Sequence, residues 1–267
     1  MDTSKKKIGD KIEALVILGL CIVTLLFDIV KITYTENSLH NAYLSKIIQL
    51  GIGSIAVCLL LRRIGIKLFG VPKKCLYLIP CVIVAIDNMQ WSSFLTGKME
   101  LINTQPIDFV LFAGYCLVVG IFEESIFRGL IFNVLAGRFS KDKKGLWKVV
   151  IGSSLLFSLA HLLNGFSLLT IMQVGYTFLT GGLFCFVLLK TKNVFCAGFI
   201  HALYNFCGLL FEIPERMGLG NGVVFDIGTI LTMFVISVIA LFFVLYSIKK
   251  YTIEEQMELY ERMGVKM

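Results

Sequence analysis

Apolar residues gather into long runs along this chain, and short polar segments separate the runs. The runs cover about 14–30, 47–61, 76–95, 109–135, 146–163, 168–189, 194–211 and 223–248. A helix of about 20 apolar residues crosses the roughly 30 Å hydrocarbon core of a bilayer, and shorter runs can extend into their flanks. The pattern predicts an all-α, polytopic membrane bundle of about eight transmembrane helices. The run 109–135 is longer than one span needs, so we expect it to bend or to leave the membrane near Arg128 and Gly129.

Positive charges are distributed unevenly between these runs. With the N-terminus placed in the cytoplasm, 20 of the 25 lysines and arginines fall in inside segments, the outside segments carry Lys31, Lys46, Lys98 and Arg216, and Arg128 lies within a span. The positive-inside rule expects this skew from a correct set of spans, so both termini should be cytoplasmic. In the tail 251–267, apolar residues recur at helical spacing, which fits a small amphipathic helix on the inner surface and a frayed end equally well.

Composition supports the membrane assignment and limits the classes of partner that the chain is expected to bind. Hydrophobic residues make up 57% of the 267 positions and charged residues only 16%, whereas soluble domains carry about 25% charged residues. The net charge of +7 follows from the topology, so we predict a lipid bilayer as partner and no nucleic acid. The eight cysteines include no C-x-x-C pair and nearly all lie in apolar runs, which is typical of small buried residues rather than disulfides or metal ligands.

Three ionisable side chains interrupt the fourth run, namely Glu123, Glu124 and Arg128. An ionised group at the centre of a bilayer costs about 2.5–3.5 kcal/mol or more, so each of them needs a partner. Glu124 and Arg128 are four residues apart, share one helix face and should pair. Glu123 lies about 100° around the helix and stays free for chemistry. The alternative is a purely structural polar cluster between helices.

Further polar groups lie in later runs. His161 falls in the fifth run, His201 and Asn205 share one face of the seventh, and His40 falls in an outside loop where it should be ordinary surface. A carboxylate beside an imidazole can hold and deprotonate a water, and a His–Asn pair can donate hydrogen bonds to an oxyanion. Together with Glu123, the two buried histidines and Asn205 form a candidate site for hydrolysing an amide.

Three motifs in this order resemble those of a known family. They are Glu123-Glu124-x-x-x-Arg128, Phe157-x-x-x-His161 and His201-x-x-x-Asn205. The resemblance is to the CPBP family, the CAAX-processing and bacteriocin-processing intramembrane proteases, also called Abi proteins. It divides the chain into N-terminal transmembrane helices (1–106), a protease core (107–210), and a last transmembrane helix with a cytoplasmic tail (211–267).

The resemblance implies an intramembrane endopeptidase that cuts a membrane-associated or secreted peptide or protein. It would be a multi-pass protein of the cell membrane, of a kind found in the bacterial plasma membrane and linked to bacteriocin immunity. By analogy, the residues that activate the attacking water are Glu123 and His161, those that stabilise the oxyanion are His201 and Asn205, and those that support them are Glu124 and Arg128. The substrate and the oligomeric state are not implied.

Metal dependence stays open at this point. Members of the family are often labelled metalloproteases, whereas the related prenyl endopeptidase is viewed as a glutamate-dependent protease without a required metal. If the enzyme uses zinc, the ligands would be Glu123, His161 and His201, because one carboxylate and two imidazoles suffice for a catalytic zinc. The chain contains no H-E-x-x-H motif, in which two histidines share one helix face.

Two functions of other classes also fit the sequence. In a non-catalytic membrane scaffold or regulator, the polar groups would only hold helices together. In a small transporter they would form a proton relay, although the chain shows no internal repeat.

One spacing fits poorly with a shared site. At about 1.5 Å per residue, Glu123 and His161 lie roughly 20 Å from the expected cytoplasmic ends of their helices, whereas His201 lies only about 10 Å from Val194. Helix tilt, a bent fourth helix or different helix ends must absorb this difference.

Overall fold

The computed structural model describes residues 15–16, 18–20, 22–24, 33–97, 104–164, 166, 168–213 and 227–265. The regular elements within these ranges are helical, which confirms the all-α fold. The α-helices are α2 (Ser38–Arg63), α3 (Leu78–Asp87), α4 (Trp91–Leu95), α5 (Pro106–Glu124), α6 (Phe132–Arg138), α7 (Lys143–Ala160), α8 (Leu168–Thr191), α9 (Val194–Leu209), α11 (Ile227–Lys249) and α12 (Ile253–Arg262). Shorter helical segments are η2 (Cys75–Tyr77), η3 (Ser125–Ile131), η4 (His161–Asn164) and η5 (Leu210–Glu212).

Several of these helices can cross a membrane. Ser38–Arg63, Pro106–Arg138, Lys143–Leu163 and Gln173–Thr191 are long and apolar enough, and Cys75–Asp87, Val194–Leu209 and Ser237–Lys249 are shorter apolar helices. They overlap the expected runs from the second onward, and the chain is a multi-pass membrane protein. The expected first span, 14–30, lies largely outside the described residues.

The prediction of one helix over 76–95 is wrong. α3 ends at Asp87, and α4 begins at Trp91 after a break. At the break, the Asn88 side chain donates to the backbone carbonyl of Tyr204 in α9 (2.9 Å), and the indole of Trp91 donates to the carbonyl of Ile86 (2.9 Å). Side chains that bond backbone carbonyls compete with the helix ladder, so the chain turns before the apolar run ends.

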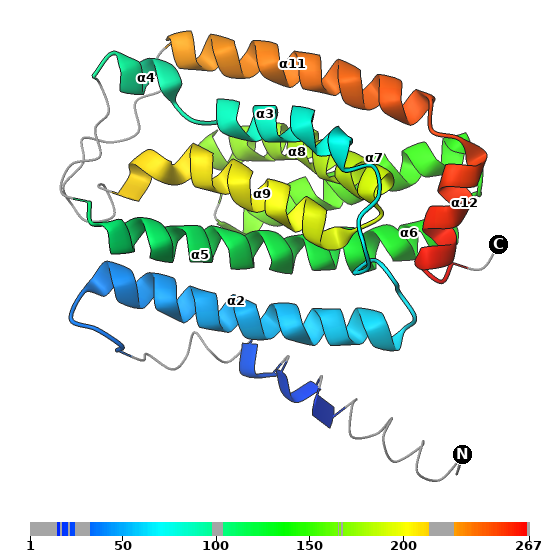
Figure 1. The fold of residues 1–267 in the computed structure, drawn as a ribbon, viewed down its shortest axis with the longest axis horizontal. Helices are drawn as coiled ribbons and strands as arrows, with labels where there is room; N and C mark the ends of the chain where they lie inside the picture. Colours follow the sequence, from blue (N-terminus) through cyan, green and yellow to red (C-terminus); the bar gives the residue numbers. More distant parts are fainter. Residues whose placement is uncertain are drawn as a thin grey trace.

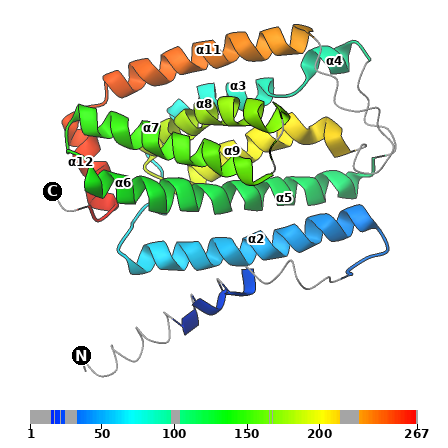
Figure 2. The same ribbon diagram turned by 180° about the vertical axis from the view of Figure 1, so that it is seen from behind.

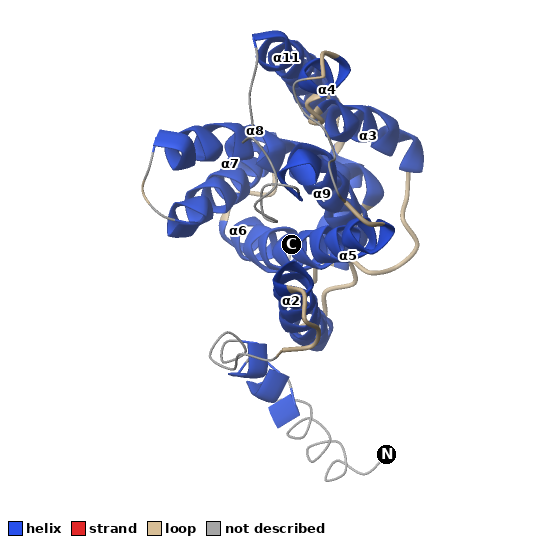
Figure 3. Cartoon of the chain, turned by 90° about the vertical axis from the view of Figure 1, so that its left-hand side faces the viewer, coloured by secondary structure: helices blue, strands red, loops and turns tan. Residues whose placement is uncertain are grey.

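The bundle is organised around α5 and α9. Figure 1 shows α2, α5, α9, α3 and α11 one after another across the molecule, and Figure 2 shows α7 and α8 from the other side. The end-on view of Figure 3 places α2 and α11 at opposite edges. A Cβ added at Gly120 of α5 would lie 2.3 Å from the carbonyl oxygen of Gly198 in α9, so these backbones touch. Small residues allow such close approach of membrane helices.

The tail folds as a helix at one end of the bundle (Figure 1). Thr252 and Glu255 form a capping box that starts α12. Tyr260 is fully buried, and the hydroxyl of Tyr251 donates to the backbone carbonyl of Leu189 near the end of α8 (3.0 Å). Of the two structures expected for the tail, the helix is therefore the one that forms, because its apolar face packs on the bundle.

The turn between α8 and α9 is buried beneath this tail. Lys192 in the turn is 3% exposed and pairs with Glu258 of α12. The N–H of Val194 donates to the backbone carbonyl of Leu68 (2.9 Å) in the segment after α2. α9 thus begins inside the protein rather than at its edge, which explains why His201 is only about two turns from the start of its helix.

Candidate active site

The candidate acids lie where the helix type changes. α5 is followed by a π-helical segment, Ser125–Ile131, which continues into α6. The carbonyl of Phe127 accepts the N–H of Phe132, five residues later, and the hydroxyl of Ser153 from α7 (3.1 Å). The irregularity expected near Arg128 is therefore a π-helical segment within one continuous stretch. Such segments occur frequently at functional sites.

Glu124 is the centre of a buried network. Its Oε1 accepts hydrogen bonds from Nη1 of Arg128 (3.0 Å) and from Nδ1 of His201 (3.0 Å). The other terminal nitrogen of Arg128 donates to the backbone carbonyl of Gly181 in α8 (2.8 Å). Glu124 and Arg128 are 0% exposed and His201 is 3% exposed. The pairing predicted from the i, i+4 spacing is present, and it extends to a third helix.

Glu123 occupies a different environment from its neighbour. Its side chain is 32% exposed, whereas that of Glu124 is fully buried. Its Oε2 lies 3.9 Å from Nε2 of His201, which is too far for a direct hydrogen bond. A single water can lie within hydrogen-bond distance, about 2.7–3.2 Å, of both atoms. The bonded Nδ1 of His201 thus directs Nε2 toward the accessible carboxylate.

The ring of Phe157 joins the two histidines of the site. Its centroid lies 5.0 Å from the imidazole of His161 and 5.6 Å from that of His201, both edge to face. The guanidinium carbon of Arg128 lies 4.6 Å from the same centroid, a cation–π contact. Phe184 stacks on the imidazole of His201, with ring centroids 4.7 Å apart. These aromatic rings fix the orientation of the His201 imidazole.

The predicted site residues are not all in direct contact. His201 bonds Glu124 and lies 3.9 Å from Glu123, whereas His161 is linked to His201 through the ring of Phe157. Nδ1 of His161 donates to the backbone carbonyl of Phe157 (3.0 Å), which leaves Nε2 as its free acceptor.

Asn205 and His40 differ from the other predicted positions. Asn205 is half-buried, one turn beyond His201 on α9, and within the described part of the chain it forms no hydrogen bond to the network. His40 does not behave as ordinary surface, because its Nε2 lies 2.6 Å from Oδ1 of the buried Asp108 at the start of α5.

Two contributors to the site carry no signal in the sequence. The carbonyl of Gly181 accepts from Arg128, and Phe184 stacks on His201. Gly181 also allows close helix contact, since a Cβ there would lie 3.1 Å from Cα of Ser154 in α7. Its role as an acceptor depends on the packing of α8 against the π-helical segment, which residue spacing within one helix cannot reveal.

The proposed zinc ligands do not form a metal site in this arrangement. Among the described residues, no group of three His, Cys, Asp or Glu side chains is placed to hold a metal ion. Nδ1 of His201 is bonded to Glu124 and Nδ1 of His161 to a backbone carbonyl, which leaves Nε2 of both rings open, as in histidines that bind zinc. The side chains of Glu123, His161 and His201 nevertheless do not converge on one point, so we derive no step through a metal.

A comparison with known protein families finds a match for the part of the chain that contains the candidate site. Residues 105–207 match the family described as Rce1-like, type II CAAX prenyl endopeptidase. Neither a curated protein nor a solved structure matches the chain. The match covers under half of the 267 residues, and it contains every candidate site residue named above. Residues 105–207 of this membrane protein are thus similar to the Rce1-like group of the CPBP family, a family of intramembrane proteases.

Proposed function

We propose that the protein is an intramembrane endopeptidase that hydrolyses a peptide bond in a membrane-associated or secreted peptide or protein. The observation that carries this proposal is the 3.9 Å separation between Oε2 of Glu123 and Nε2 of His201. The gap accommodates one oxygen atom between an accessible carboxylate and an imidazole held in place by a buried ion pair. The membrane-spanning helices around it support a substrate that arrives from the bilayer.

In the proposed mechanism, Glu123 accepts a proton from the water while the water oxygen attacks the amide carbon. His201, as an imidazolium, donates from Nδ1 to Glu124 and from Nε2 to the oxyanion that develops on the substrate. Asn205, one turn along α9, supplies a second donor to that oxyanion. Glu123 then passes the proton to the leaving amine, and His161, with its free Nε2, assists this transfer.

The test is cleavage by the Glu123→Gln variant. General acid–base groups contribute about 10²–10⁴-fold to rate, so we expect a loss of at least about 100-fold with unchanged folding. The readout is a comparison of membrane and secreted peptidomes between cells that carry the wild type and cells that carry the variant. Glu254→Gln, an exposed carboxylate of α12, is the matched control and should retain activity. Wild-type peptide processing by Glu123→Gln would overturn the proposal.

A second candidate, a non-catalytic scaffold or regulator, has one observation in its favour. Glu124, Arg128 and His201 bond one another in a buried network that needs no substrate, although among the described residues Oε2 of Glu124 and Nε of Arg128 have no hydrogen-bond partner. Under this reading Glu123 has no function, so a cell phenotype restored in full by Glu123→Gln would favour the scaffold. A phenotype restored by Glu254→Gln alone would favour the protease.

A further inference from the structure

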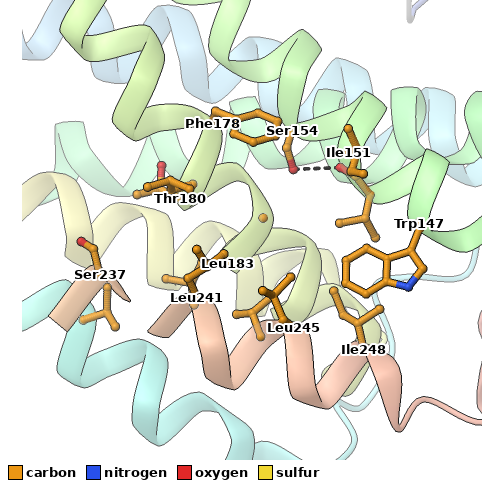
Figure 4. Close-up of a pocket in the computed structure, with 15 residues that line it drawn as sticks. Trp147, Ile151, Ser154, Phe178, Thr180, Leu183, Ser237, Leu241, Leu245 and Ile248 are labelled. Atoms are coloured by element: carbon orange, nitrogen blue, oxygen red, sulfur yellow. Dashed lines mark hydrogen bonds between the residues drawn. The ribbon is translucent and has the colours of Figure 1, made fainter. Parts of the chain in front are cut away.

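An apolar groove lies between α7, α8 and α11. It has a volume of about 260 Å³. Figure 4 shows Trp147 and Ile248 at one end, and Thr180 and Ser237 at the other. The side chains between these ends are almost all apolar, with Ile151, Leu183, Leu241 and Leu245 among them. The groove uses none of the residues assigned to hydrolysis.

The dimensions of the groove match one leaflet of a bilayer. Along α11 it extends from Ser237 to Ile248, about 16 Å at 1.5 Å per residue. Half of a hydrocarbon core that is about 30 Å thick is about 15 Å. Trp147 lies at the end that charge distribution predicts to be cytoplasmic, and tryptophan is enriched at membrane–water interfaces. A long apolar slot of this length fits an acyl chain of an inner-leaflet lipid.

Lysines surround the Trp147 end of the groove. Nζ of Lys143 donates to the backbone carbonyl of Lys249 (2.9 Å), which joins the start of α7 to the end of α11. Lys144, one turn before Trp147, and Lys250 are exposed, and the ammonium group of Lys250 lies 4.6 Å from the ring centroid of Tyr246.

One carboxylate, that of Asp142, lies at this end and interacts with Lys144, so it offsets part of the positive charge without outnumbering the lysines. The Asp142 carboxylate caps α7 by accepting from the N–H of Gly145 (2.8 Å), and it also accepts from the hydroxyl of Ser140 (2.6 Å). Basic pockets between membrane helices on the cytoplasmic side bind anionic lipid headgroups.

We propose that this groove binds one anionic phospholipid. Its acyl chain fills the slot between α7, α8 and α11, and its phosphate lies against Lys143, Lys144, Lys249 and Lys250. The apolar walls explain why a hydrocarbon chain enters, and the lysines explain why an anionic lipid is chosen over a zwitterionic one. The binding is independent of the proposed peptide hydrolysis.

The fluorescence of Trp147 reports on occupancy of the groove. The sequence contains two tryptophans, so a Trp91→Phe background leaves Trp147 as the sole tryptophan. The purified full chain is reconstituted with phosphatidylglycerol or phosphatidylcholine that carries brominated acyl chains, which quench tryptophan on contact. We expect half-maximal quenching at an at least fivefold lower mole fraction of brominated phosphatidylglycerol than of brominated phosphatidylcholine. Equal quenching by both lipids, or quenching by neither, would overturn the proposal.

Filling the groove tests the acyl-chain part. A Cβ at Gly182, which lines the groove, meets no atom within 4 Å, so Gly182→Leu places its side chain in the slot without a backbone clash. Gly175→Leu, on the same helix but outside the groove and equally open, is the matched control. The preference for phosphatidylglycerol should disappear in Gly182→Leu and persist in Gly175→Leu. An unchanged preference for phosphatidylglycerol in Gly182→Leu would show that the acyl chain does not occupy this groove.

Charge removal tests the headgroup part and remains decisive if Gly182→Leu does not fold. Lys144→Gln with Lys249→Gln should weaken the lipid preference by about fivefold for each lysine, since a basic residue near an anionic surface contributes about 1 kcal/mol. Arg62→Gln with Lys67→Gln removes two exposed charges at the end of α2 and should leave the preference unchanged. If both double variants weaken the lipid preference equally, anionic lipids are attracted to the positively charged surface in general, and the proposed headgroup site is wrong.

Discussion

Glu124 is the residue on which the buried network depends, because it bonds both Arg128 and His201. A local rule predicted half of this arrangement, since residues four apart on a helix share a face. The other half could not be predicted, because the contact with His201 depends on how closely α5 and α9 pack. For the same reason, the family resemblance paired Glu123 with His161 as the groups that activate water. The imidazole that lies 3.9 Å from the Glu123 carboxylate is that of His201.

Arg128→Met should destabilise the protein strongly. The substitution leaves the carboxylate of Glu124 buried without its cation, and breaking a buried ion pair in this way costs about 3–5 kcal/mol. Unfolding in detergent measures the loss. The double variant Arg128→Met with Glu124→Leu removes both charges and should recover much of the stability, although not the activity. A single variant that loses less than about 1 kcal/mol would show that the pair is not structurally important.

At the scale of whole elements, the site depends on the contact between α5 and α9. Gly120 and Gly198 allow this contact, and the carbonyl of Gly198 lies where a Cβ of residue 120 would stand. The sequence predicted most helices because apolar runs are local patterns. It missed the break after Asp87, since the partner of Asn88 is a carbonyl of α9.

Gly120→Ala should separate α5 from α9 and weaken the bond between Glu124 and His201. Overpacking of this kind costs about 1–3 kcal/mol, and we expect a loss of peptide cleavage that exceeds the loss of stability. Gly114→Ala on the same helix is the control, because its Cβ would meet only the movable tip of Ile47 at 3.3 Å. Both variants are compared by unfolding and by cleavage assay. Equal behaviour of the two would contradict the role assigned to the close approach.

At the scale of the whole molecule, α12 ties the tail to distant parts of the chain. Glu258 pairs with Lys192 in the turn between α8 and α9 and with Lys73 after α2. The sequence allowed a helix in the tail, but it did not indicate that this helix covers the start of α9. That covering depends on contacts between segments more than a hundred residues apart.

Attachment of α12 should weaken in acid. Hydrogen bonds from the ammonium groups of Lys192 and Lys73 lower the pKa of Glu258 to about 2. A lowered pKa of a carboxyl group contributes stability that is fully present above its unfolded value, about 4.5, and is lost as the pH falls toward 2. Hydrogen exchange of residues 253–262, corrected for intrinsic rates, should therefore increase between pH 5 and pH 3.

The matched variants separate this ion pair from general effects of charge. Glu258→Gln should raise exchange in α12 already at pH 7, whereas Glu254→Gln, an exposed neighbour on the same helix, should not. Exchange that is unchanged in Glu258→Gln would show that apolar packing alone holds the tail.

The buried start of α9 has a consequence for the choice of lipid environment. Most membrane helices adjust their tilt when hydrocarbon thickness changes, yet Val194 is anchored to Leu68 by a backbone hydrogen bond inside the protein. His201 should therefore keep its position when acyl chains are lengthened or shortened. Cleavage by protein reconstituted in thin and thick bilayers should vary less than about twofold, and a steep dependence would mean that lipids, not neighbouring polypeptide, set the depth of this imidazole.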